Sequence, residues 1–266
     1  MSAEAIDKLA ETGAAKARFL AENPLGFGVS SMMAGIYVGF GILLIFSVGS
    51  VIDPSVRPLA MGATFGLALI LVVFAGADLY TGLTMSMPLA VLEGRASGDA
   101  LGRVWAASWF GNLAGALMLA GLFVLGGGGL ITTASSELIY KAAAAKMNME
   151  ALPLLCRAIL CNWLVCLALW MSVRIANEAA RMVAIAWCLL AFIASGYEHS
   201  VANMTLFGVA LLSPHPEAVT WSGMLWNLFW VTLGNTIAGT LFMAGAYWLV
   251  AKKPAAVLAP RPAPAE

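Results

Sequence analysis

The chain has 266 residues, of which 61% are hydrophobic and 11% are charged, whereas an ordinary soluble domain carries roughly 25% charged residues. Fourteen Lys and Arg residues balance fourteen Asp and Glu residues, so no strongly charged partner is indicated. This composition excludes a soluble enzyme, a nucleic-acid-binding protein and a disordered chain, and it predicts a multi-pass membrane protein.

Six hydrophobic segments can cross a bilayer as helices, because about 20 apolar residues span the hydrocarbon core. Residues 1–22, before the first segment, have the spaced apolar positions of an amphipathic surface helix. We expect one transmembrane domain over residues 1–253, followed by a disordered cytoplasmic tail, residues 254–266, that is rich in Pro and Ala. The expected segments are 25–48, 58–92, 104–125, 153–173, 179–212 and 224–250.

The basic residues are unevenly divided between the two sides of these spans. Six spans place both termini on one side, and that side would carry ten of the fourteen Lys and Arg residues. Because cytoplasmic loops are enriched in these residues, both termini are expected in the cytoplasm.

The second and fifth segments, each of about 34 residues, are too long for one straight span. Each has one carboxylate near its middle, Asp78 or Glu198. A glycine stands two positions before each acid, at Gly76 and Gly196, and these glycines are 120 residues apart. The long segments are therefore interpreted as broken helices.

A Gly-Asn pair recurs in the third and sixth segments, at residues 111–112 and 234–235, which are 123 residues apart. The similar offsets indicate two related halves of three spans, and an odd number of spans forces the second half to insert upside down. The sequence thus predicts an all-α membrane protein of six transmembrane helices, a 3+3 inverted repeat with helices two and five broken. Such breaks indicate a substrate path near the middle of the membrane.

Unwound backbone at membrane depth must face protein or a water-filled cavity, because lipid cannot pair with its N–H and C=O groups. A half-helix that begins there can hold an anion on its free N–H groups without a lysine or arginine. Asp78 and Glu198 are interpreted as caps on these donors that stabilise the loops, with a proton relay as the alternative.

His199 is the only histidine within a predicted span. It is either a buried core histidine bonded to the backbone, or a pore residue that donates a hydrogen bond or a proton to an anion. Its position in a predicted break favours the second interpretation. Thr81 is the best candidate for a further pore hydroxyl, because its neighbour Gly82 can open the backbone.

Two more polar residues have both a structural and a functional interpretation. Asn162, in the middle of the fourth segment, could bridge helices. Lys146, on the outer side, is either an ordinary interfacial lysine or an attractor of anions at a pore mouth. The four cysteines lie in apolar runs without CxxC spacing, so neither a metal ion nor a cofactor is predicted.

Several long stretches resemble the formate/nitrite transporter family, and its nitrite-channel branch most closely. The resemblance covers nearly the whole chain up to the C-terminal tail. The matching stretches are NPLGFGVSSMMAGIYVGFGILLIF, DPSVRPLAMGATFGLAL, LCNWLVCLALWM, WCLLAFIASGYEHSVANMTLF and WVTLGNTIAG.

The resemblance implies an aquaporin-like protomer and a homopentamer with one pore per protomer, in the bacterial cytoplasmic (inner) membrane. It implies passage of small monovalent weak-acid anions, with nitrite as the first choice and formate or hydrosulfide as the alternative. It also implies roles for eight residues: a central polar pair, His199 and Thr81; an inner hydrophobic constriction, Leu69 and Phe192; an outer constriction, Leu79 and Val165; and an outer anion-handling pair, Lys146 and Asn162.

Three residues depart from the family pattern. Tyr80 and Tyr197 stand where formate-channel relatives tend to carry Phe, and Leu83 stands where nitrite-branch relatives often carry a second histidine. A mechanism that needs two imidazoles on the path is therefore disfavoured.

The expected mechanism is passage of the anion through two dry slits that flank a polar chamber. A bare anion enters an apolar slit at high cost, whereas the neutral acid does not. A proton from His199 or from vestibule water would let nitrite cross, either with that proton or alone if the slits open.

Two other classes of function remain as alternatives. An intramembrane hydrolase could use Ser195 and His199, which are four residues apart and would share a helix face, but no oxyanion arrangement accompanies them. A purely structural membrane protein would not need paired broken helices. No enzyme activity is therefore predicted.

Overall fold

The computed structural model describes residues 2–132 and 137–251, which form helices joined by short connections. The predicted tail, residues 254–266, lies outside the described residues. In chain order the helices are α1 (Ser2–Glu22), α2 (Pro24–Val51), α3 (Arg57–Ala75), α4 (Tyr80–Leu92), α5 (Gly98–Leu125), α6 (Leu138–Met147), α7 (Ala151–Ser172), α8 (Glu178–Ala194), α9 (Ser200–Leu212), α10 (Trp221–Ile237), the π-helical η1 (Ala238–Gly245) and α11 (Ala246–Ala251).

Five stretches of the described chain are long and apolar enough to cross a membrane. They are α2, α3, α5, α7 and the continuous run Trp221–Ala251 formed by α10, η1 and α11. The predicted segments 58–92 and 179–212 are each divided into two helices, α3 with α4 and α8 with α9.

The short helices α4 and α9 have 13 residues each, and most of their side chains are buried. A helix that is buried on all sides lies inside a bundle and does not face lipid. The two half-helices therefore form the centre of the molecule, and the long helices surround them.

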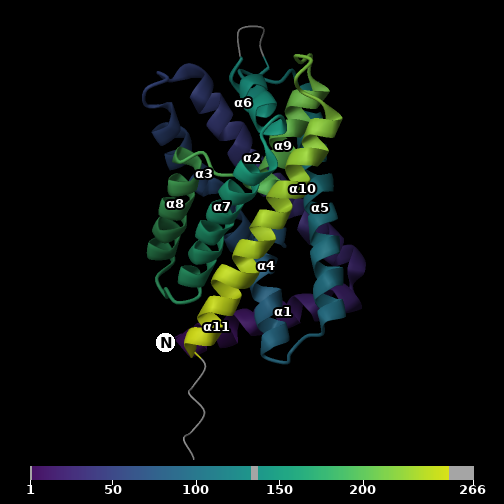
Figure 1. The fold of residues 1–266 in the computed structure, drawn as a ribbon, viewed down its shortest axis with the longest axis vertical. Helices are drawn as coiled ribbons and strands as arrows, with labels where there is room; N and C mark the ends of the chain where they lie inside the picture. The colour runs from purple at the N-terminus through teal and green to yellow at the C-terminus, as the bar shows by residue number, and fades with distance from the viewer. Residues whose placement is uncertain (1, 133–136, 252–266) are drawn as a thin grey trace, which may run out of the picture.

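The helices α1 and α6 lie at opposite ends of the bundle (Figure 1). The apolar face of α1 is buried through Ala5, Ile6, Leu9 and Ala10, which pack against side chains of α4, α7 and η1. The sequence predicted an amphipathic helix over residues 1–22 on the membrane surface. Its apolar face covers one end of the bundle, where it packs against buried side chains of α4 and η1, among them Met85, Leu89 and Met243. A position at the membrane surface stays a prediction.

Glycines bring the backbones of neighbouring helices close together. In α5, a Cβ atom on Gly115 would collide with the backbone carbonyl of Met32 in α2. In α10, a Cβ atom on Gly234 would collide with α7 at Ala158. Small residues at such crossings let transmembrane helices pack closely, so the pairs α2–α5 and α7–α10 are fixed at short range.

Replacement of Gly115 by Ala should therefore destabilise the protein by about 1–3 kcal/mol, the usual cost of overpacking. The matched control is Gly121→Ala in the same helix, where a Cβ atom would meet nothing within 4 Å. The midpoint of thermal unfolding in detergent should fall for the first variant and stay level or rise for the second. Equal midpoints for the two variants would contradict the close α2–α5 contact.

Candidate functional site

Each central half-helix begins after a short break in the chain. Gly76 follows α3 with φ of 75°, and Gly196 follows α8 with φ of 70°. Glycine adopts this left-handed backbone at little cost. The residue directly before each half-helix is extended, with φ −89° and ψ 121° at Leu79 and φ −116° and ψ 118° at His199.

Asn112 of α5 pairs the polar backbone groups of the first break. Its Oδ1 accepts a hydrogen bond from the N–H of Tyr80 at 2.9 Å. Its Nδ2 donates to the carbonyl oxygens of Asp78 at 2.9 Å and Ser31 at 2.7 Å. The side chain is fully buried, so the first break is bonded to protein at membrane depth.

Asn235 of α10 makes the corresponding set of bonds at the second break. Its Oδ1 accepts from the N–H of Ser200 at 2.9 Å. Its Nδ2 donates to the carbonyl oxygens of Glu198 at 3.0 Å and Ala158 at 2.8 Å. The Gly-Asn pairs that mark the two halves in the sequence thus close the two breaks.

His199 caps its own helix with one ring nitrogen and reaches Thr81 with the other. Its Nδ1 accepts a hydrogen bond from the N–H of Ala202 at 3.1 Å, and its Nε2 lies 3.1 Å from Oγ1 of Thr81. Because Nδ1 is an acceptor, the neutral ring carries its proton on Nε2, and this N–H donates a hydrogen bond to Oγ1 of Thr81. The structure therefore brings the predicted central pair together.

The four constriction residues of the resemblance and His199 meet at one small cavity, which we call the central chamber. Its volume is about 10 Å³, and a cavity needs roughly that volume to hold one water molecule. Of the side chains that line it in the described part of the chain, His199 alone is polar. The lining residues are Val38, Phe65, Ala68, Leu69, Leu79, Val165, Leu189, Phe192 and His199.

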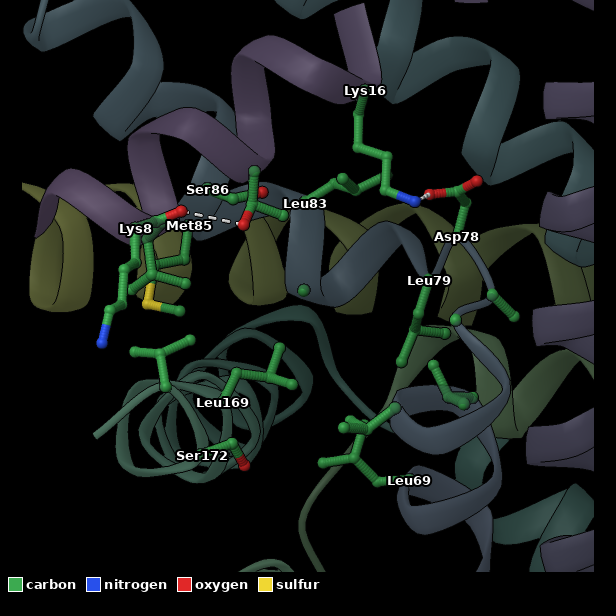
Figure 2. Close-up of a pocket in the computed structure, with 18 of the residues that line it drawn as sticks. Lys8, Lys16, Leu69, Asp78, Leu79, Leu83, Met85, Ser86, Leu169 and Ser172 are labelled. Carbon is green, nitrogen blue, oxygen red and sulfur yellow. Dashed lines mark hydrogen bonds and ion pairs between the residues drawn. The ribbon is translucent and has the colours of Figure 1, made fainter. Parts of the chain in front are cut away.

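Figure 2 shows side chains that line a larger cavity of about 530 Å³, which we call the α1-side vestibule. Leu69 and Leu79 line both cavities, so these two side chains separate them. The basic side chains Lys8, Lys16 and Arg181 line the vestibule. Positive charge is thus concentrated outside the chamber, on its α1 side.

All four constriction residues line the chamber, and Leu69 and Leu79 also line the vestibule. The break places Leu79 directly before α4, between the vestibule and the chamber. The division into an inner constriction, Leu69 with Phe192, and an outer one, Leu79 with Val165, stays a prediction.

Each break also contains an acid that is paired with a lysine from an end helix. Lys16 Nζ of α1 lies 2.7 Å from Oδ1 of Asp78 (Figure 2), and Lys146 Nζ of α6 lies 2.6 Å from Oε1 of Glu198. The two carboxylate side chains are 0% and 1% exposed, whereas the lysines are 26% and 23% exposed. Both lysines therefore bring charge from the ends of the bundle to buried acids.

The prediction that Asp78 and Glu198 cap the free N–H groups is wrong. Asn112, Asn235 and His199 accept those bonds. Glu198 instead accepts from Lys146 and, at 2.7 Å, from Nδ2 of Asn203 on α9. A buried carboxylate needs an opposite charge, because removing it from water costs several kcal/mol, whereas a neutral amide can cap an N–H group without that cost.

Asn162 bridges helices, as one of its two interpretations predicted. Its Nδ2 donates to Oγ1 of Thr84 in α4 at 2.9 Å and to the carbonyl oxygen of Asn235 in α10 at 2.6 Å. These contacts differ from those of Lys146, so the structure does not join the two residues as a pair. A role in anion handling stays a prediction for both.

The geometry that the hydrolase alternative requires is absent from the described chain. Ser195 follows the last turn of α8, whereas His199 precedes α9, so the two residues do not share a helix. The imidazole is bonded to Thr81 and Ala202, and a hydrolase would need it to activate the serine.

The sequence did not predict the pairing of Lys16 with Asp78 or the bonds of Asn112 and Asn235. An acid within a span signals that a counter-ion is needed, but nothing along the chain indicates which basic residue supplies it. The two asparagines were visible only as marks of a repeat, because an amide gives no sign of its hydrogen-bond partners in the sequence.

Comparisons with known proteins agree on one family. The family model described as "Formate/nitrite transporter" matches residues 3–249. The nitrite transporter NirC of Escherichia coli (strain K12) is 51% identical over 253 residues, which are 95% of this chain and 94% of that protein.

Two solved structures are similar to the whole fold. One is described as an "FNT family ion channel", with a TM-score of 0.91, 50% identity and coverage of 94% of this chain and 100% of that chain. The other is a "Pentameric formate channel with formate bound", with a TM-score of 0.72, 26% identity and coverage of 85% and 96%.

The two buried ion pairs predict the outcome of charge removal. Lys16→Met should leave Asp78 buried without a counter-ion and destabilise the protein by about 3–5 kcal/mol. Adding Asp78→Asn should restore most of the stability. The control, Lys8→Met, breaks only an exposed pair with Glu4 and should have little effect. Thermal midpoints of the purified proteins measure this, and a double variant no more stable than Lys16→Met would contradict it.

Proposed function

The chain belongs to the formate/nitrite transporter family, and we propose that it conducts nitrite across a membrane through a pore within each protomer. Half of its residues are identical to those of a nitrite transporter over nearly the full length. The observation that carries the proposal is the central chamber, in which apolar side chains surround one imidazole. Such a chamber suits a small weak acid that crosses as a neutral molecule.

The proposed architecture is a 3+3 inverted repeat. In it, α3 with α4 forms the broken second span and α8 with α9 the broken fifth span. The paired features of the two halves support this arrangement: a left-handed glycine, an acid with a lysine partner and a bridging asparagine occur at each break. We extend the proposal to a homopentamer in a bacterial inner membrane with both termini in the cytoplasm, on the basis of the pentameric relative and the basic-residue bias.

Basic side chains lie at both ends of the bundle and the chamber between them is lined by apolar side chains and one imidazole, and this distribution of charge suggests the order of steps by which an anion crosses. Lys8, Lys16 and Arg181 attract anions to the α1-side vestibule, and Lys146 does so at the opposite end. The carboxylates of Asp78 and Glu198 partly neutralise two of these lysines, which prevents tight retention. The anion thus arrives at the apolar side chains without a strong fixed charge beside it.

Entry into the central chamber requires neutralisation. Burial of an isolated carboxylate-like charge among apolar groups is far more costly than burial of the neutral acid. The Nδ1 of His199 already accepts a backbone hydrogen bond, so a cationic ring would lose that bond. Vestibule water is therefore the proton source. During passage, the Nε2–H of His199 exchanges its hydrogen bond to Thr81 for one to the crossing molecule.

The chamber must also widen during passage. Its volume of about 10 Å³ accommodates at most one water molecule, and nitrite has three heavy atoms. The side chains of Leu69, Leu79 and Phe192 therefore have to change rotamer to admit it.

Formate is the second candidate substrate. The fold resembles that of a pentameric formate channel solved with formate bound, and formate is also a small monovalent weak-acid anion. Leu83, which lines the vestibule, stands where nitrite-branch relatives often carry a second histidine. This position therefore does not favour nitrite over formate. Parallel flux measurements with nitrite, formate and hydrosulfide in liposomes distinguish the candidates, and faster formate flux would replace nitrite as the proposed substrate.

His199→Phe should lower nitrite flux by about tenfold or more while the protein still assembles, because the chamber loses the one polar side chain that lines it among the described residues. The matched control is His215→Phe, which changes the chain's other histidine in an exposed loop and should leave flux unchanged. Proteoliposome uptake per assembled protein measures both variants. Undiminished uptake by His199→Phe would contradict the proposed path.

A further inference from the structure

Two asparagines each bracket one extended residue that lines the pore. Asn112 bonds to the carbonyl oxygen of Asp78 and the N–H of Tyr80, the groups on either side of Leu79. Leu79 lines both the central chamber and the vestibule. One side-chain amide therefore spans the residue that separates the two cavities.

The second asparagine has the same relation to the imidazole. Asn235 bonds to the carbonyl oxygen of Glu198 and the N–H of Ser200, the groups on either side of His199. His199 lines the chamber. The two amides thus hold the two break residues that contact the proposed path.

An asparagine can do this because its amide has the polarity of a peptide group. In an extended strand, the carbonyl of one residue and the N–H two positions later point to the same side, where a neighbouring strand pairs with both. The Asn side chain offers an acceptor and a donor in one plane. Each asparagine therefore replaces a neighbouring strand for one residue, where an actual strand could not fit within a helical bundle.

The third bond of each amide ties the break to another helix. The remaining Nδ2 proton of Asn112 is donated to Ser31 in α2, and that of Asn235 to Ala158 in α7. Both side chains are fully buried, and each has its oxygen and both amide protons engaged. The close α2–α5 and α7–α10 contacts consequently fix where each break lies.

We infer that Asn112 and Asn235 are positioning residues of the pore. Asn112 holds Leu79 as the barrier between vestibule and chamber, and Asn235 holds His199 so that its Nε2 proton faces Thr81. This inference rests on the proposed function, because it takes the chamber to be the anion path. It goes further in assigning the two asparagines separate effects: the loss of Asn235 acts through the imidazole, and the loss of Asn112 does not.

The test uses the full-length protein in lipid with ¹⁵N-labelled histidine. A His215→Phe background leaves one imidazole, His199, whose two nitrogens report its tautomer and hydrogen bonds. Asn235→Leu should shift or broaden these signals, whereas Asn112→Leu should leave them unchanged. The control is Ser108→Ala, a buried residue in α5 whose hydroxyl bonds only to Trp105 of the same helix, and it should also leave them unchanged.

Nitrite flux in proteoliposomes provides the second measurement. Both Leu variants should lose about tenfold or more, the scale of a misplaced donor or barrier, and Ser108→Ala should not. If a Leu variant fails to assemble, the corresponding Asp variant, Asn235→Asp or Asn112→Asp, replaces it in both measurements. Asp keeps the shape of the side chain but removes the amide donor, so the same outcomes are expected.

The inference is overturned if both asparagine variants change the histidine signals alike, or if Asn235 variants leave them unchanged. The proposed function fails separately, if His199→Phe conducts nitrite normally. A changed imidazole signal in Asn235→Leu together with normal flux in His199→Phe would keep the positioning geometry and reject the path.

Discussion

Hydrocarbon cannot form hydrogen bonds, and this constraint accounts for the arrangement of the centre of the molecule. Every N–H or C=O group that leaves a helix at membrane depth costs several kcal/mol unless protein or water pairs with it. The two breaks release such groups beside Leu79 and His199, and buried asparagines from neighbouring helices bond to them. The same constraint explains why Asp78 and Glu198 have lysine partners. The breaks are thus stable only because helices from elsewhere in the chain supply specific partners.

This arrangement separates charge from the narrow part of the proposed path. Lysines and an arginine stand at the vestibule and at the α6 end, whereas the chamber between them is apolar except for one imidazole. Charge at the ends raises the local concentration of anions. A fixed charge in the chamber would hold an anion too firmly for rapid release. A neutral ring that donates one hydrogen bond gives selectivity for a polar molecule without trapping an ion.

The sequence predicted the elements that depend on local pattern. Segment lengths, the glycines before the acids and the repeated Gly-Asn pairs indicated where the chain would unwind, and α3, α4, α8 and α9 begin and end close to those points. The pairing of Thr81 with His199 came from the family resemblance, since 118 residues separate them. Lys16 was missed as a counter-ion, because its pairing with Asp78 depends on how α1 and the first break pack in three dimensions.

The central claim is that the anion crosses an apolar chamber as its neutral acid, so nitrite moves together with a proton. Nitrite uptake into proteoliposomes, with and without an inward proton gradient and at a fixed membrane potential, tests it most directly, with protein-free liposomes as the background. The account predicts that the gradient drives the nitrite concentration inside the vesicles above the external concentration and that the luminal pH falls with uptake. Uptake that follows the membrane potential and ignores the proton gradient would contradict it.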